Sequence, residues 1–284
     1  MNRLYSRLLY IILIYFPVFL FGQSRLWEIL HPNQKGVSYL YGTMHVKDTR
    51  VFTFPPKTLT CFDQCKLLCL ELDPGDPAFM SLLMQYSQSP ADSALDNLLS
   101  PAEYQQLSLW VKDSAGLELS TLKRFRPLFI HSLLMEKMDA GGNAEALDIW
   151  FYQRAVEKKI KVEGLETPEE QVQALSGISL TEQAHELYQW TQAPEIRNQS
   201  TQALMEAYLS GDLEALGKMA EEWEMDPTFK QALIEQRNAR MLNRMQVYLG
   251  DGSVFIAVGA LHLAGDQGII AGLRRAGYRV NPLP

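Results

Sequence analysis

Residues 253–263, SVFIAVGALHL, join a continuous apolar run to a glycine and, three residues later, to His262. A short apolar run of this kind is typical of a strand buried on both faces, as in a parallel sheet. Residues 38–46, SYLYGTMHV, have the same order and lead to His45. The chain has only five histidines, so two Gly-x-x-His segments after strand-like runs indicate a shared site. Two unrelated capping or core histidines are the alternative.

Carboxylates follow the other two apolar strand-like segments of the chain. Residues 67–70 lead to Glu71 and Asp73, and residues 160–163 lead to Glu166. In open α/β sheets, ligands bind beyond the carboxyl ends of the strands. If all these strands share one sheet, two imidazoles and two or three carboxylates meet at one edge. Such a set can bind a divalent metal ion, which can activate a water molecule for hydrolysis.

The remaining sequence predicts strands near both ends of the chain and a mostly helical middle. A turn signal between two apolar stretches indicates a β-hairpin at the start of the domain. Helical patterns follow, interrupted by the strand at 160–163, and the longest run covers 180–249 with breaks at 210–212 and 225–227. We therefore expect an α/β fold of the mixed α+β kind, with a central mixed sheet, flanking helices and a long helical insertion.

The first 23 residues have the pattern of a secretory signal peptide. Arg3 and Arg7 precede an apolar run from Leu8 to Phe21, which is short for a membrane span. The segment FGQS is a poor cleavage site, so an uncleaved N-terminal membrane anchor is the alternative. We expect an exported protein, periplasmic, secreted or membrane-anchored, whose single domain covers residues 24–284. No pattern in the sequence predicts the oligomeric state.

The overall composition limits the classes of partner. The formal net charge of −7 and pI near 5.3 argue against a nucleic-acid partner, which requires a basic surface. The three cysteines, Cys61, Cys65 and Cys69, match neither a disulfide framework nor a zinc motif. We expect them to be buried as small apolar residues.

Five segments together resemble the TraB/PrgY/GumN family, whose animal relatives include the Tiki proteases that cleave Wnt proteins. They are YLYGTMHV, LLCLELD, LDIWFYQRAVEKKIKVEGLETPEEQ, EQRNARM and VGALHLAGDQGIIAGLRRAGYRV. The resemblance implies a Tiki-like metal-dependent hydrolase, related in fold to the erythromycin esterases. It also implies that His45, Glu71 and His262 bind a divalent metal ion, either Mn, Co or Zn.

The same resemblance adds candidates for catalysis and substrate binding. Glu166 is the candidate for a fourth ligand or a general base, and Arg237 for polarising the scissile carbonyl. Asn238, next to Arg237, is a candidate for contacting the substrate. Gln171, five residues after Glu166, is a further candidate because it could orient a ligand, and a solvated helix position is the alternative. We expect an exported, peptidase-like hydrolase that cuts a peptide bond or another amide or ester bond of a peptide or small molecule. A non-catalytic protein that sequesters such a ligand is the alternative, and a polar edge left without function is a third.

Overall fold

The computed structural model describes residues 23–31, 36–46, 48–138, 145–222, 231–250 and 252–284. The expected signal segment therefore lies outside the described residues except for Gln23, and so does the helix break expected at 225–227. Within the described residues, no helix is long and apolar enough to cross a membrane.

A six-stranded mixed sheet forms the centre of the fold, with the strand order β4-β3-β5-β2-β1-β6. The pairs β4–β3, β3–β5 and β5–β2 are parallel, whereas β1 is antiparallel to both β2 and β6. The predicted hairpin and the four predicted strands are thus confirmed. The strands are β1 (Leu26–Leu30), β2 (Val37–Thr43), β3 (Leu67–Leu70), β4 (Lys161–Gly164), β5 (Val254–Gly259) and β6 (Arg279–Leu283).

The central strand β5 organises the sheet because it pairs with β3 on one side and β2 on the other. Its first five residues are buried, as the continuous apolar run predicts for a strand covered on both faces. In the register, Thr43 is opposite Gly259 and Leu70 is opposite Ala257. The carboxyl ends of β2, β3 and β5 therefore lie close together.

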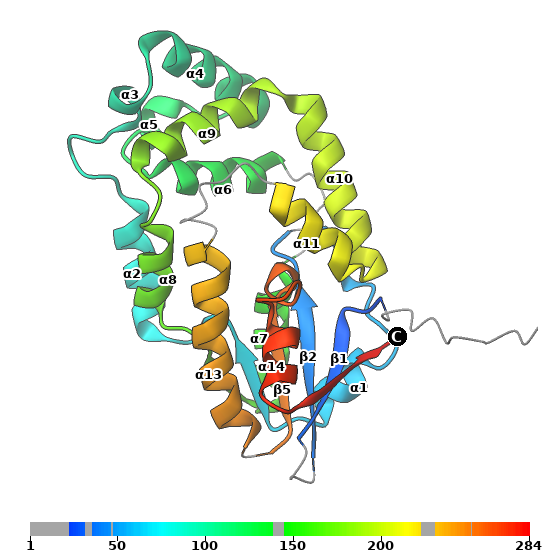
Figure 1. Ribbon diagram of the computed structural model, residues 1–284. Coiled ribbons are helices and arrows are strands. Elements are labelled where there is room, and N and C mark those ends of the chain that lie inside the picture. The colour runs from blue at the N-terminus through cyan, green and yellow to red at the C-terminus, as the bar shows by residue number, and fades with distance from the viewer. Residues whose placement is uncertain (1–22, 32–35, 47, 139–144, 223–230, 251) are drawn as a thin grey trace, which may run out of the picture.

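Helices cover both faces of the sheet (Figure 1). The core on one face contains Phe62 of α1, Phe151 of α7 and Tyr208 of α10. The core on the other face contains Met241 of α13 and Leu273 of α14. The covering helices are α1 (Thr58–Asp63), α7 (Leu147–Lys158), α10 (Pro194–Ser210), α11 (Leu213–Glu222), α13 (Arg237–Leu249) and α14 (Ile269–Arg275).

A helical lobe with its own core stands beyond the carboxyl ends of the parallel strands (Figure 1). Its core residues come from α3 (Leu95–Leu98), α4 (Pro101–Ala115), α5 (Leu119–Leu122), α6 (Pro127–Met138) and α9 (Leu180–Gln192). α2 (Pro77–Ser87) and α8 (Pro168–Leu175) pack together between this lobe and the sheet. This lobe is the helical insertion that the sequence predicts.

Local sequence signals explain where several elements begin and end. α4 and α8 both begin with a capping box, in which Ser100 pairs with Glu103 and Thr167 pairs with Glu170. The break predicted at 210–212 is confirmed, because Gly211 adopts a left-handed conformation after α10, which glycine tolerates at low cost. The short elements are η1 (Thr49–Phe52), the π-helix η2 (Gln231–Gln236) and η3 (Ala260–His262).

The three cysteines are buried and free, as the sequence predicts. Cys65 donates to the carbonyl of Cys61 over 3.3 Å and contacts the hydroxyl of Ser253. Burial raises the pKa of the Cys65 thiol to about 11 and also raises that of Cys69. Cys61 and Cys65 belong to the core on the α1 side of the sheet, and Cys69 belongs to the core on the other side.

Candidate functional site

Four parallel strands deliver their polar residues to one edge of the sheet. His45 follows β2 by two residues, Glu71 directly follows β3, and Glu166 follows β4 by two residues. His262 ends η3, the short turn that follows β5. The shared edge that the sequence predicts is thus present.

Glu71 lies at the centre of this edge and is 8% exposed. Its Oε1 accepts a hydrogen bond of 2.7 Å from the backbone N–H of Gly259. The same oxygen is 3.9 Å from Nε2 of His45 and 3.8 Å from Nε2 of His262. Its other oxygen, Oε2, accepts a 2.6 Å hydrogen bond from Arg237. One carboxylate oxygen therefore faces both imidazoles, while the other is held by a guanidinium.

Gly259 makes room for this convergence by lacking a side chain. A Cβ atom there would lie 3.1 Å from Oε1 of Glu71, 3.6 Å from Cδ2 of His262 and 3.8 Å from Nε2 of His45. The space in front of Gly259 is therefore bordered by all three candidate ligands. The glycine of this Gly-x-x-His segment is part of the site itself.

His262 is held from behind by Asn238. The amide Nδ2 of Asn238 donates to the carbonyl of Gln267 over 2.8 Å, so Oδ1 is the atom that faces Nδ1 of His262 at 2.7 Å. An amide oxygen only accepts, so Nδ1 of His262 carries a proton. The lone pair of Nε2 in the neutral ring is then directed toward Glu71.

His45 has a carboxylate at Nδ1 instead, in a close charged contact that lacks the aligned geometry of a hydrogen bond. Its Nδ1 lies 2.9 Å from Oδ2 of Asp148, a residue in the first turn of α7. The other carboxylate oxygen of Asp148 accepts a 2.9 Å hydrogen bond from the hydroxyl of Thr43. The His45 side chain is 59% exposed, whereas that of His262 is 6% exposed.

Arg237 joins the two glutamates of the edge. Its Nε donates to Oε2 of Glu166 over 2.8 Å, and its Nη2 lies within 2.6 Å of both Glu71 and Glu166. Arg240 donates to the second oxygen of Glu166 over 3.2 Å. Glu166 is buried, and each of its two oxygens accepts a hydrogen bond from an arginine. Arginine suits this position because its planar guanidinium presents several donors at once.

The charges of the site shift the pKa values of its members. Burial raises the pKa of Glu71, but His262, His45 and Arg237 outweigh burial and hold it well below its usual range. Burial lowers the pKa of His262, only partly opposed by the charge of Glu71. The charge of Asp148 raises the pKa of His45 well above its usual value. The two imidazoles thus differ in basicity as well as in exposure.

The predicted site residues divide into four groups by position. His45, Glu71 and His262 converge, and Arg237 with Glu166 adjoins them through Glu71. Asn238 is completely buried behind His262. Gln171 lies on α8, where its backbone N–H donates to the carbonyl of Thr167, and no contact joins its side chain to the histidines.

Sequence reasoning missed Asp148, Thr43 and Arg240. An acidic residue in the first turn of a helix is ordinarily explained by the helix dipole, so Asp148 carries no distinctive signal. Arg240 lies one helical turn after Arg237, and this i, i+3 spacing on an expected helix could have indicated that both face the same carboxylate.

The donor set fits a divalent metal ion. Within the described ranges, no three His, Cys, Asp or Glu side chains already stand in a geometry that would hold one. However, two bonds of about 2.0–2.2 Å to one ion span at most about 4.4 Å between donor atoms. The 3.9 Å and 3.8 Å separations of the two imidazole nitrogens from Glu71 fall within that span. Two imidazoles whose Nδ1 atoms face Asn238 and Asp148, together with a carboxylate, are suitable ligands.

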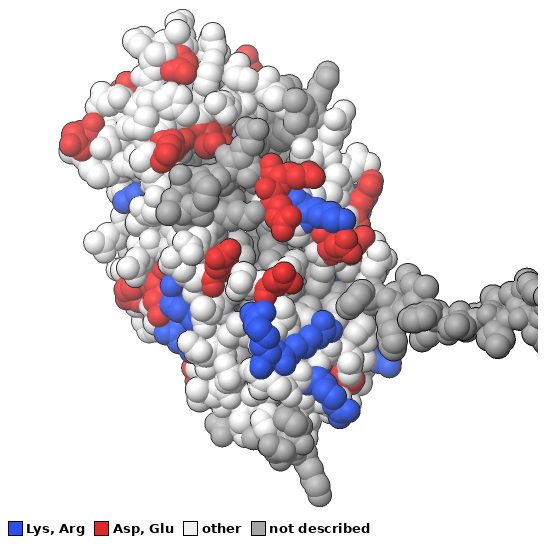
Figure 2. All heavy atoms as spheres, viewed as in Figure 1, with Lys and Arg blue, Asp and Glu red and all other residues white. Residues whose placement is uncertain are grey.

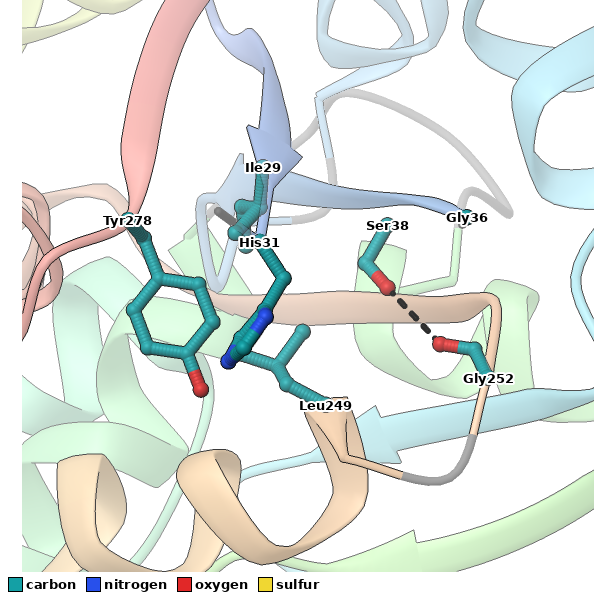
Figure 3. A pocket seen from close by; sticks show the side chains of 7 residues that line it. All are labelled: Ile29, His31, Gly36, Ser38, Leu249, Gly252 and Tyr278. Carbon is teal, nitrogen blue, oxygen red and sulfur yellow. Dashed lines mark hydrogen bonds between the residues drawn. The ribbon is translucent and has the colours of Figure 1, made fainter. Parts of the chain in front are cut away.

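A small pocket lies at the end of the strands opposite to the polar edge. Figure 3 shows His31 and Tyr278 beside it, together with Ser38, which donates to the carbonyl of Gly252 over 3.1 Å. Its volume of about 20 Å³ is room for little more than one water molecule. This pocket is therefore separate from the polar edge and too small for a substrate.

The charged side chains visible in Figure 2 do not form a field of one sign. Acidic residues lie over the upper, helical part of this face, and basic residues gather near α14, whose last turn contains Arg274 and Arg275. Both signs of charge are therefore present on this face, each over a different part of it.

Comparison with known proteins shows which chains this one is similar to. The chain is 29% identical to the protein named metalloprotease TIKI1 of Xenopus tropicalis and 27% identical to that of Homo sapiens, each over 92% of this chain. It covers 62% of the length of each of these relatives. An uncharacterized protein of Treponema pallidum is 31% identical over 69% of this chain and 60% of its own length.

No solved structure matches the chain closely enough to add to the description of the fold. The model of the TraB/PrgY/gumN family, in contrast, matches residues 25–282, from the first strand to the last. It includes every element that contributes to the polar edge. The chain belongs to the TraB/PrgY/gumN family.

Proposed function

We propose that this protein is a metal-dependent hydrolase of peptide bonds, with His45, Glu71 and His262 as the metal ligands. The observation that supports this most strongly is the convergence of both Nε2 atoms on one oxygen of Glu71. Two neutral imidazole nitrogens and a carboxylate oxygen at these distances repel one another; a proton on His45, whose pKa is raised, relieves this in part and must leave when a metal ion binds. A divalent cation at this point relieves the repulsion.

When bound there, a divalent ion would lower the pKa of a coordinated water molecule and polarise a carbonyl oxygen. The protein's own residues prepare the site for this chemistry. Asn238 holds the proton on Nδ1 of His262, and the Gly259 N–H fixes Oε1 of Glu71. Arg237 donates to the oxygen of Glu71 that faces away from the histidines, and together with His262 and His45 it holds the pKa of Glu71 well below its usual range.

Arg237 and Glu166 act next to the ligands in this proposal. Both oxygens of Glu166 are bound by arginines, which favours a role in orienting Arg237 over one as a fourth ligand. The Nη1 group of Arg237 has only a 3.5 Å contact with the carbonyl of Leu233. It is the donor that remains for polarising a substrate carbonyl, an interaction that gains strength in a poorly solvated site.

A peptide substrate is proposed because the relatives are named metalloproteases. The exposed side of the site is that of His45, with a side chain 59% exposed. A substrate would therefore approach from the side of β2. Export of the protein rests on the signal-like pattern of residues 1–23.

The test compares three histidine variants of the full chain. Each is treated with a chelator and equilibrated with Mn²⁺, Co²⁺ or Zn²⁺, and bound metal and cleavage of a peptide library are measured. His45→Ala and His262→Ala should lose both, while His185→Ala, which alters an exposed histidine of α9, should lose neither. Metal binding by both site variants at the wild-type level would refute the proposal. Metal binding by a wild-type protein that cuts no peptide would support the sequestering protein instead.

A further inference from the structure

We propose that Asp148 is a positioning residue for His45, which it holds with Nδ1 turned inward and Nε2 turned toward Glu71. The consequence for metal binding rests on the proposed function, whereas the orientation of the ring does not. The relevant side chain comes from α7, an element to which sequence and family comparison assign no role in the site.

The side chains of His45 and Asp148 differ in exposure. The His45 side chain is 59% exposed, whereas that of Asp148 is 14% exposed, and they meet at 2.9 Å. An exposed side chain ordinarily samples several rotamers, and ordering it costs conformational entropy. A buried carboxylate at one ring nitrogen restricts the ring to orientations in which the other nitrogen faces the site.

Asp148 is itself held in place. Its Oδ1 accepts a 2.9 Å hydrogen bond from Thr43, which is 1% exposed at the end of β2. The end of β2 and the residues just after it therefore supply both the hydroxyl that contacts the carboxylate and the imidazole. The helix is anchored on the sheet by Leu147 and Phe151, each completely buried. The aspartate thus stands on a rigid support.

Two other roles for Asp148 agree less well with these contacts. As a metal ligand it would have to lie on the Nε2 side of His45, yet its Oδ2 contacts Nδ1. As a helix cap it would bond to the free N–H groups of α7, but the N-cap position is Ala146 and makes no side-chain hydrogen bond. Its two oxygens instead contact Thr43 and His45. General stabilisation of the helix by an acidic residue in the first turn is the alternative that an experiment must separate.

Substitution of Asp148 in the full chain separates these roles through metal affinity. Asp148→Asn keeps the shape but removes the charge, and we expect the affinity for Co²⁺ to fall about 10- to 100-fold, as for other residues that orient metal-binding histidines. Thr43→Val should give a smaller loss in the same direction. Glu157→Gln removes an exposed acidic residue from the same helix and should leave the affinity unchanged. Wild-type affinity in Asp148→Asn would overturn the effect on metal binding.

The orientation itself is measured without metal. In chelated protein at a pH where the ring is neutral, ¹⁵N NMR should place the His45 proton on Nδ1, with the signal assigned by its absence in His45→Ala. In Asp148→Ala the proton should move to Nε2. A proton on Nε2 in the wild type, or no change in the variant, would overturn the inference. If Asp148→Ala does not fold, Thr43→Val should give a partial shift of the same sign.

The two measurements have different consequences. If the proton moves as expected but the wild type binds no metal, the orientation by Asp148 holds and the proposed function fails. If the wild type binds metal through both histidines and the proton position is independent of Asp148, the proposed function holds and this inference fails.

Discussion

The segments at the carboxyl ends of β2 and β5, called the exits of these strands below, have the same Gly-x-x-His spacing but differ in their surroundings. His262 is buried and held by the neutral amide of Asn238, whereas His45 is exposed and held by the carboxylate of Asp148. The spacing brings each imidazole to the sheet edge, while the residue behind it decides its basicity and exposure. A repeated motif therefore yields one buried and one accessible nitrogen at a single carboxylate.

The largest expected difference between the two exits is in stability. Replacing a buried ring leaves a cavity and an unpaired amide, so His262→Ala should lower the free energy of unfolding by about 2–4 kcal/mol. His45→Ala removes an exposed ring and should lower it by less than about 1 kcal/mol. Urea denaturation of chelated protein measures both values. Equal losses would show that exposure does not distinguish the two exits.

The two glycines provide the next comparison. A Cβ at Gly42 would lie 3.1 Å from the Cβ of Ala260 and 3.3 Å from Leu263, within packed atoms. We expect Gly42→Ala to cost about 1–3 kcal/mol of stability through overpacking. Gly259→Ala places its methyl group 3.1 Å from the Glu71 carboxylate and should lower metal affinity about tenfold. Thermal melting and metal titration of both variants should therefore rank them in opposite orders.

The smallest expected difference is in the pH dependence of stability without metal. Because the pKa of His262 is lowered by burial, its contribution is complete above about pH 6.5 and decreases as the pH falls below that value. Because the pKa of His45 is raised by Asp148, its contribution is complete below about pH 6.5 and is lost as the pH rises through the folded-state value.

Glutamine variants test these opposite signs. His262→Gln should flatten the acidic side of the stability profile, by at most about 1.4 kcal/mol per pH unit. His45→Gln should flatten the alkaline side by less, because solvent screens an exposed pair. Denaturation midpoints from pH 5 to 9 in the presence of a chelator supply the profile. Flattening of the same side in both variants would contradict the assigned directions.

Much of the fold could be predicted because its signals are local. The continuous apolar run of β5, the glycine at 211 and the capping boxes of α4 and α8 each act within a few residues. The sequence also predicted that the residues after the four parallel strands lie together, since parallel strands have their carboxyl ends at the same edge of a sheet. The final strand, β6, had no clear pattern because it is a short edge segment that contains Pro282.

The surroundings of the candidate ligands could not be predicted in the same way. Asp148 is separated from Thr43 by 105 residues, and no local pattern links a first-turn aspartate to a distant histidine. Arg237 and Asn238 are adjacent in sequence but point to different partners, one to the glutamates and one to His262. Which neighbour each side chain contacts depends on the packing of α13 against the sheet, which periodicity alone does not specify.

The position of β5 in the strand order has a consequence for how the chain folds. β5 lies between β2 and β3, yet it is the fifth of the six strands in sequence. β2 and β3 therefore have no shared neighbour until residues 254–259 have been synthesised. Contacts between segments this far apart form slowly. A ribosome-bound chain that ends before β5 would contain the hairpin and the segments of the helical lobe, but the candidate ligands His45 and Glu71 would have no common edge on which to meet.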